Sequence, residues 1–303
     1  MYDEEKRQNE YMRTFILGTD WGTDCDDVVA VRLLTRAFKE KKINLAAIGI
    51  NHCLPNSIAS LDGFLTKEGV VGVPLGLDYD ITEGEGRYQD HLAQYASFYH
   101  SNGDAEDAVR LYRRILAEAK DRVEILEIGF LHVIAKVLES GPDDISDMNG
   151  LDLVREKVAK LWIMAGKWDQ DGGLEYNIKF NSITRRATHI LCKKCPVPIT
   201  FLGWEVGHDV ITGGDLKKDD ILYRVLCDHR SSNGRSSWDP MLVMLALVGD
   251  EKEAGYSIVR GNARVDEESG CNYFELKEEG LHCYVVRLQE PEYYAKQIND
   301  IIN

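Results

Sequence analysis

The sequence predicts a single α/β domain with a mostly parallel, Rossmann-like central sheet flanked by helices and small antiparallel strands near the C-terminus. Short apolar runs alternate with amphipathic segments over most of the 303 residues, the pattern of a parallel sheet with helices on both faces. Residues 256–288 instead alternate apolar and polar side chains, as antiparallel strands do. No repeat or Gly/Ser/Pro linker interrupts the chain, so we expect one domain over residues 1–303, with residues 1–13 as a flexible N-terminal extension.

The individual elements follow from these patterns in chain order. Apolar runs predict strands at residues 14–18, 44–50, 71–77, 123–128, 160–165 and 198–202. Helices are predicted at residues 27–38, 57–66, 105–119, 131–139, 240–248 and 293–302. The clearest is 105–119, where apolar residues recur at spacings of three and four and so share one face.

Charge and composition limit the function. The 36 basic and 51 acidic residues give a net charge of −15, which repels phosphate backbones and anionic lipid. We therefore expect no nucleic-acid or membrane partner, but a neutral small molecule or one held through a cation. No apolar run approaches the ~20 residues of a membrane span, and the charged start is unlike a signal peptide. Seven cysteines with one close pair favour a reduced, cytoplasmic protein.

Ligands of open parallel sheets bind beyond the carboxyl ends of the strands. The loops to inspect are therefore residues 19–27, 51–55, 78–90, 129–132, 166–177 and 203–208. The polar loop 78–90 is long enough to act as a lid over a site.

The turn after the first predicted strand is strongly acidic. Asp20, Asp24, Asp26 and Asp27 lie within eight residues, and two carboxylates ~4 Å apart repel by about 4 kcal/mol at an effective dielectric near 20. Such a cluster requires a divalent cation, protonation or solvent between the charges, and oxygen ligands suit Ca²⁺ or Mg²⁺. The alternative is a solvated acidic loop in which Asp26 or Asp27 caps the next helix. A phosphatase of the haloacid-dehalogenase type is disfavoured, because Gly18 stands where its nucleophilic aspartate would be.

The segment GTDWGTDCDDVVA at residues 18–30 resembles the aspartate motif of the inosine–uridine-preferring nucleoside hydrolase family. Two extra residues before the final Asp-Asp resemble a divergent bacterial branch. Further segments similar to family motifs follow in the same order, at residues 49–51, 73–76, 128–135, 164–166, 175–177 and 236–240. The likeness runs from about residue 14 to the C-terminus, and it implies the fold of this family.

The resemblance implies a Ca²⁺ site at the bottom of the pocket. Its ligands would be Asp20, Asp27, Asp239 and the backbone carbonyl oxygen of His132. The implied reaction is hydrolysis of the N-glycosidic bond of a ribonucleoside or related N-riboside, through an oxocarbenium-like transition state. Ca²⁺ orients a water, and Asp20 accepts its proton. By the same resemblance we expect a homo-oligomer, dimer or tetramer, in purine or pyrimidine nucleoside metabolism.

The resemblance also assigns the substrate contacts. Asp26 and Asn51 would hold ribose hydroxyls, and Glu175 and Asn177 would hold the far side of the sugar. Trp238 or Trp204 would stack on the base, with packing in the core as the alternative.

Two positions depart from the family pattern. Gly18 replaces the first aspartate of the motif, and Trp238 stands where several members have a histidine that protonates the leaving base. These departures support an alternative function, a non-catalytic or weakly active ribose- or sugar-binding protein on the same scaffold. Whether the inserted Asp24 faces the metal or the solvent is left open by the sequence.

Overall fold

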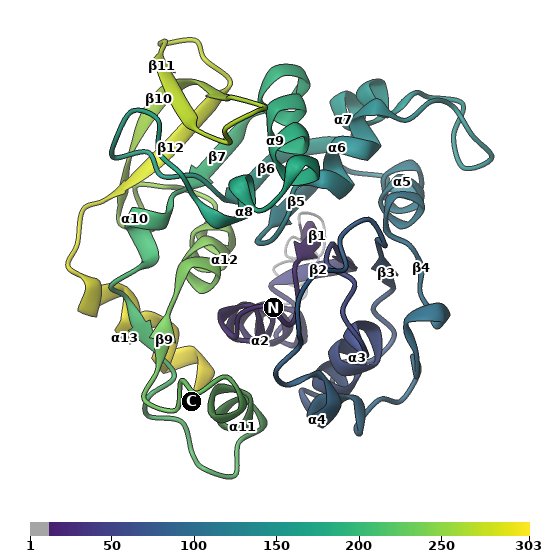
Figure 1. The fold of residues 1–303 in the computed structure, drawn as a ribbon, viewed down its shortest axis with the longest axis vertical. Coiled ribbons are helices and arrows are strands. Elements are labelled where there is room, and N and C mark those ends of the chain that lie inside the picture. The colour runs from purple at the N-terminus through teal and green to yellow at the C-terminus, as the bar shows by residue number, and fades with distance from the viewer. Residues whose placement is uncertain (1–11) are drawn as a thin grey trace, which may run out of the picture.

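A computed structural model describes residues 12–303, and its central element is a ten-stranded sheet (Figure 1). The strands are β1 (Arg13–Thr19), β2 (Ile43–Ile50), β3 (Leu75–Leu77), β4 (Glu106–Asp107), β5 (Val123–Glu127), β6 (Val158–Met164), β7 (Ile199–Leu202), β10 (Tyr256–Val265), β11 (Asn272–Leu276) and β12 (His282–Arg287). Their order across the sheet is β11-β10-β12-β7-β6-β5-β1-β2-β3-β4. The predicted extension over residues 1–13 falls mainly on residues 1–11, outside the described residues, and β1 begins at Arg13.

The central strands are parallel, and β1 lies between β2 and β5. Gly18 on β1 is therefore paired with Gly49 on one side and with Glu127 on the other. The C-terminal strand β10 runs antiparallel to both β11 and β12, while β12 lies parallel to β7. The predicted fold class is confirmed, and the antiparallel strands extend the main sheet.

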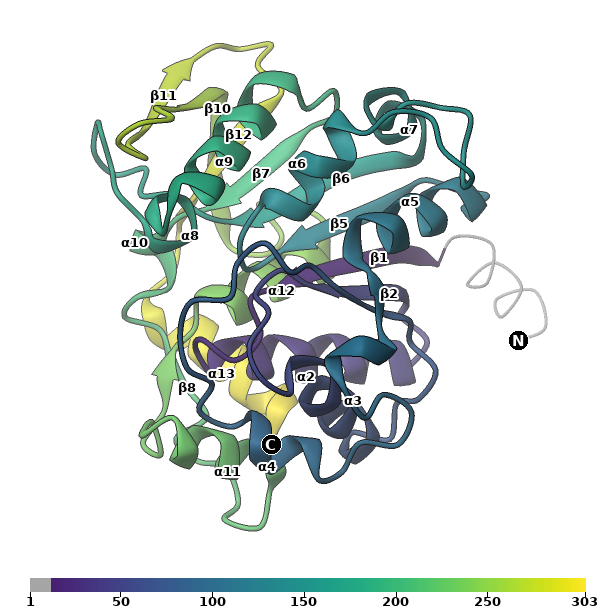
Figure 2. The ribbon, with the colours of Figure 1, turned by 45° about the vertical axis from the view of Figure 1, so that its right-hand side comes forward.

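Helices cover both faces of the sheet (Figure 2). One face carries α2 (Asp26–Lys39), α3 (Ser57–Lys67), α11 (Ile221–Asp228), α12 (Trp238–Val248) and α13 (Pro291–Ile302). The other carries α5 (Ala108–Glu118), α6 (His132–Glu139), α7 (Gly150–Lys157) and α9 (Ser182–Lys194). Apolar side chains of each layer pack on the sheet and form the two main core clusters.

The shorter elements lie in the connections. They are α4 (Gln89–Ala93), the 3₁₀ turn η1 (Asn102–Asp104), α8 (Tyr176–Lys179), α10 (Trp204–Gly207) and the antiparallel ribbon of β8 (Ile211–Thr212) and β9 (Arg235–Ser236). Across residues 12–303, no helix is both long and apolar enough to cross a membrane.

Some boundaries differ from the prediction. The strand expected from residue 71 begins at Leu75, because Gly72 has a φ of +80° and Val71 is exposed. The helix expected from residue 105 begins at Ala108, where the Asp107 side chain accepts a hydrogen bond from the backbone N–H of Arg110.

Candidate functional site

A cavity of about 530 Å³ opens at the carboxyl ends of the parallel strands. Asp20 follows β1, Ile128 follows β5, Met164 ends β6 and Trp204 follows β7, and all four line it. The remaining walls come from the segments around α8, α11, β9 and α12 and from the loop before α4. The volume lies within the range of about 300–1,000 Å³ that is typical of small-molecule sites.

The acidic turn is fixed by a buried aromatic anchor. Trp21 is fully buried and donates a hydrogen bond from Nε1 to Ser60 Oγ at 2.8 Å. The next residue, Gly22, has a φ of +113°, and a Cβ there would meet the Gln89 side chain at 1.4 Å. Only glycine fits this position, and the turn it allows brings Asp20 to within 2.6 Å of the Thr23 hydroxyl.

Three carboxylates from two distant segments meet on the floor of the cavity. We call Asp26, Asp27 and Asp239 the acid trio, since one oxygen of each lies within 4.8 Å of the others. Asp26 and Asp27 begin α2, and Asp239 lies in the first turn of α12. The backbone N–H of Asp239 donates a hydrogen bond to Asp26 Oδ2 at 3.2 Å. All three are at most 5% exposed, so the alternative of a solvated acidic loop is wrong.

Burial and mutual repulsion dominate the electrostatics of the floor. Burial, followed by the charges of neighbouring aspartates, raises the pKa of each member of the acid trio well above 3.8. Burial also raises the pKa of Asp20 to about 6, against a hydrogen bond from Thr23 that lowers it. The positive ends of the α2 and α12 dipoles offset only part of this charge.

The floor fits a hard divalent cation. Among residues 12–303, no lysine, arginine or histidine forms an ion pair with the acid trio. Several buried carboxylate oxygens without a protein cation are the donor set that Ca²⁺ or Mg²⁺ takes. Asp20 lines the same cavity outside this close cluster, and its charge raises the pKa of Asp27 and Asp239.

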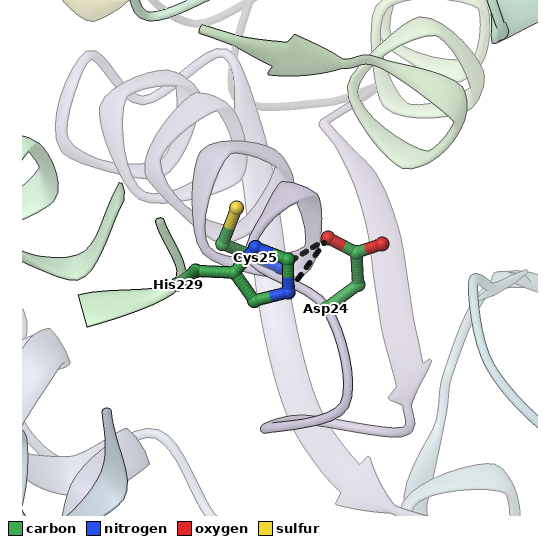
Figure 3. Close-up of side chains that lie close together, drawn as sticks. All are labelled: Asp24, Cys25 and His229. Atoms are coloured by element: carbon green, nitrogen blue, oxygen red, sulfur yellow. Dashed lines mark hydrogen bonds and ion pairs between the residues drawn. The ribbon is translucent and has the colours of Figure 1, made fainter. Parts of the chain in front are cut away.

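Asp24 belongs to a different environment at the rim of the cavity. Its two oxygens accept hydrogen bonds from Arg235, from Nε at 2.9 Å and from Nη2, and His229 Nε2 lies 3.5 Å from Oδ1. Figure 3 shows the His229 ring facing one oxygen of Asp24, with Cys25 beside them. These three residues are close enough for a metal ion, but Arg235 occupies the carboxylate and burial raises the pKa of the Cys25 thiol. Asp24 thus points to Arg235 and not to the acid trio.

Three of the four residues predicted to hold the sugar line the cavity, and one of them, Asp26, belongs to the acid trio. Glu175 and Asn177 line the cavity, and the Glu175 carboxylate accepts backbone hydrogen bonds from Asn177 at 2.7 Å and Gly166 at 3.1 Å. Burial raises the pKa of Glu175 to about 7. Asn51 is fully buried and does not line the cavity. Its Oδ1 accepts from the Phe130 backbone N–H at 3.0 Å, and Nδ2 has no partner among the described residues.

His132 begins α6 beneath the cavity but does not line it. Its side chain points to Asp78, with Nε2 and Oδ1 2.9 Å apart, and Lys136 also pairs with this carboxylate. The metal ligand implied at this position is the backbone carbonyl oxygen, so that assignment stays a prediction.

A further buried carboxyl group lies behind Gly18. A Cβ at Gly18 would lie 1.8 Å from Glu127 Oε2 and 2.7 Å from the Tyr112 hydroxyl. The Tyr112 hydroxyl donates to Glu127 Oε1 at 3.3 Å, and Oε2 has no partner within the described chain. Burial raises the pKa of Glu127 to about 8. The space left by the missing aspartate of the motif therefore holds an acid from the neighbouring strand.

Trp238 and Trp204 both line the cavity. Trp238 is half-buried and donates from Nε1 to the Trp204 carbonyl oxygen at 2.9 Å. This bond orients the indole ring and occupies its only donor. Stacking on a base remains a prediction for both rings.

The sequence did not single out three nitrogen-bearing side chains of the cavity, those of Arg87, His229 and Arg235. Arg87 lies in the loop expected to act as a lid, where one basic residue carries no recognisable signature. His229 and Arg235 follow α11 and precede α12, outside the loops selected from the strand ends. The one available signal was Asp24, an acid without an assigned partner.

No protein-family model matches the sequence, and no curated protein matches it. The fold is similar to several solved structures. An inosine-uridine preferring nucleoside hydrolase from Bacillus anthracis has a TM-score of 0.71 at 13% identity, over 96% of this chain and 99% of that one. The effector protein XOO4466 has a TM-score of 0.65 at 13% identity, over 99% and 96% of the chains. The type III effector XopQ, solved with adenosine diphosphate ribose, has a TM-score of 0.64 at 16% identity over the same shares.

These likenesses concern the fold alone because the identities are low. They agree with the fold that the sequence resemblance implied, and they include both a hydrolase and effector proteins.

Proposed function

We propose that this protein is a metal-dependent N-glycosyl hydrolase that releases ribose and a free base from a ribonucleoside or related N-riboside. The observation that carries the proposal is the convergence of the acid trio beside Asp20 on the floor of a cavity sized for a small molecule. The fold shared with a nucleoside hydrolase supports it. Ca²⁺ is the proposed ion, held by Asp20, Asp27, Asp239 and the backbone carbonyl oxygen of His132.

Bound there, the ion would supply Lewis acidity that orients a water and lowers its pKa. Residues of the chain would accept the proton and bind the substrate. Asp20, held by Thr23 at 2.6 Å, accepts the proton of that water as a general base. Asp26 and Asn51 bind ribose hydroxyls from below, and the unpartnered Nδ2 of Asn51 supports this assignment. Glu175 and Asn177 bind from the side wall, while Trp238 stacks on the base. The negative floor favours the positively charged sugar of the transition state over the neutral ground state.

The test is release of reducing sugar from a panel of ribonucleosides in the presence of Ca²⁺. The wild type is expected to release sugar from at least one of them, and Asp20→Asn is expected to abolish release while circular dichroism stays unchanged. Asp219→Asn, which alters an exposed acid outside the cavity, serves as the matched control. Equal activity of Asp20→Asn and wild type would refute the role of Asp20.

A second candidate is a ribose- or sugar-binding protein with little or no catalysis. It is supported by Trp238, whose indole N–H is not an acid and donates to the Trp204 carbonyl oxygen, so that no acid for the departing base stands at that position. Two of the structural neighbours are effector proteins, and one of them was solved with adenosine diphosphate ribose. In this case the panel yields no sugar, whereas ribose still raises the melting temperature.

Other expectations from the sequence stay predictions. They are one domain over residues 1–303, a dimer or tetramer, a cytoplasmic location, and a part in purine or pyrimidine nucleoside metabolism. Light scattering of the purified protein would measure the oligomeric state.

A further inference from the structure

Charge is segregated along the depth of the cavity. The acid trio is buried on the floor, whereas two arginines of the same cavity, Arg87 and Arg235, reach solvent, and a buried histidine, His229, accompanies them. We call Arg87, His229 and Arg235 the basic rim. They come from three separate segments, the loop before α4, the residue after α11 and strand β9, and all three line the same cavity as the acid trio.

The basic rim carries more positive charge than the chain itself neutralises. Asp24 pairs with Arg235 through Nε and Nη2, which leaves Nη1 without a hydrogen bond inside the described chain. Arg87 is exposed and forms no hydrogen bond or ion pair with residues 12–303. Burial lowers the pKa of His229, and the charges of Arg87 and Arg235 lower it further against the effect of Asp24. Arg87 lines the same cavity as His229, and its charge is the surplus at the rim.

Such a rim has the chemistry of an anion site. An arginine whose Nε and Nη2 are fixed by a carboxylate is held in one orientation, with its free Nη1 available to a ligand oxygen. A second, uncommitted arginine adds charge-assisted hydrogen bonds, which are about twice as strong as neutral ones. His229 is 8% exposed and has Nδ1 3.1 Å from Ser231 Oγ, so its ring is also held in place.

We propose that the basic rim binds a phosphate or diphosphate group of the ligand, so that within the N-ribosides a phosphorylated compound is preferred over a neutral nucleoside. The inference rests on the proposed function, because it concerns the same cavity. A single ligand would place its ribose over the acidic floor and its anionic group at the rim. It replaces the expectation of a neutral ligand, since the net charge of −15 describes the whole molecule and not the mouth of this cavity.

The test uses ligands whose binding does not depend on catalysis. Calorimetry in the presence of Ca²⁺ would compare ribose, ribose 5-phosphate, ADP-ribose and inorganic phosphate. At least one of the two phosphorylated ribosyl compounds is expected to bind about tenfold or more tightly than ribose. A gain with ribose 5-phosphate identifies a phosphate directly on the sugar, and a gain with ADP-ribose alone identifies a diphosphate that reaches further. Inorganic phosphate is expected to bind more weakly than either.

The decisive variant is Arg87→Ala, which is expected to remove most of the preference for phosphorylated ligands while leaving ribose binding unchanged. Arg87→Lys should keep part of it, because the charge remains. Lys218→Ala, an exposed cation outside the cavity, should keep all of it. Equal affinities for ribose and both phosphorylated compounds, or an unchanged preference in Arg87→Ala, would overturn the proposal.

The outcome is separable from that of the proposed function. Sugar release from a neutral nucleoside without any phosphate preference would keep the hydrolase and reject the phosphate site. Phosphate-dependent binding that requires Arg87, without sugar release from any riboside, would keep the phosphate site and reject hydrolysis.

Discussion

The floor and the rim of the cavity use neighbouring residues of one acidic turn in opposite ways. Asp24 at the rim is paired with Arg235 through two hydrogen bonds, whereas Asp26 and Asp27 on the floor face another acid, Asp239, and accept hydrogen bonds from uncharged donors, a backbone N–H and the Thr19 hydroxyl. Both regions lie at the start of α2, so sequence position does not explain the difference. The difference comes from the partner of each region: β9 brings Arg235 to the rim, and α12 brings Asp239 to the floor.

This comparison shows why an uncompensated floor is informative. An isolated carboxylate buried in a low dielectric is strongly unfavourable, and proteins pair or hydrogen-bond such groups. Within residues 12–303, a protein cation pairs with the carboxylate at the rim but none pairs with the carboxylates on the floor. Three close carboxylates are then stable together only with protons or with a cation from outside, so the floor and not the rim is the candidate metal site.

The largest expected effect comes from neutralising the floor. Ca²⁺ at 100 times its Kd should stabilise the wild type by about 2.7 kcal/mol. Asp27→Asn should lose most of this stabilisation, and its sugar-releasing activity should fall by about 100-fold. In chelator the same variant should be more stable than wild type at pH 8, because it relieves like-charge repulsion. Melting curves with Ca²⁺ and with chelator measure both effects, with Asp219→Asn as control. An unchanged Ca²⁺ response in Asp27→Asn would remove the basis of the comparison.

The next effect concerns Glu127, a buried acid that belongs to neither region. Its pKa is raised from 4.5 to about 8, so the folded protein keeps a proton that the unfolded chain releases. Stability should therefore fall as pH rises from 4.5 to 8, by up to about 1.4 kcal/mol per unit. Glu127→Gln does not titrate and should gain stability relative to wild type over this range. Urea unfolding at pH 5, 6, 7 and 8 would measure the free energy of unfolding of both proteins. Parallel pH profiles of wild type and Glu127→Gln would contradict the prediction.

The smallest effect is expected at the rim. Asp24→Asn leaves Arg235 without its ion pair in a half-buried position, and should lower the free energy of unfolding by about 1 kcal/mol while the Ca²⁺ response stays intact. Asp144→Asn breaks a similar two-bond pair with Arg110 on the exposed surface, and should change stability by less than about 0.5 kcal/mol. Loss of the Ca²⁺ response in Asp24→Asn would assign Asp24 to the floor.

Most strands and the helices that cover them were predictable, because their apolar patterns are strong and local. The helices α7, α9 and α11 were not. In α9 the buried side includes Thr184, Ala187 and Thr188 with few large apolar residues, so its periodicity is weak. Its start was marked by Asn181, whose side chain accepts from the backbone N–H groups of Ile183 and Thr184.

The carboxylates of the floor were identified from motifs, and the structure brings Asp26, Asp27 and Asp239 together. The basic rim was not predictable by the same route. Arg235 reaches the cavity only because the β8–β9 ribbon places it opposite Asp24, which depends on tertiary packing. The orientation of Asp24 could likewise be decided only by seeing its partner.

The contact between Gly18 and Glu127 has a consequence for engineering. Restoring an aspartate at position 18 alone would push its side chain into the oxygen of Glu127, since the two positions are paired across β1 and β5. The two positions are thus mutually dependent, and a switch toward the common motif needs Gly18→Asp together with a small residue in place of Glu127.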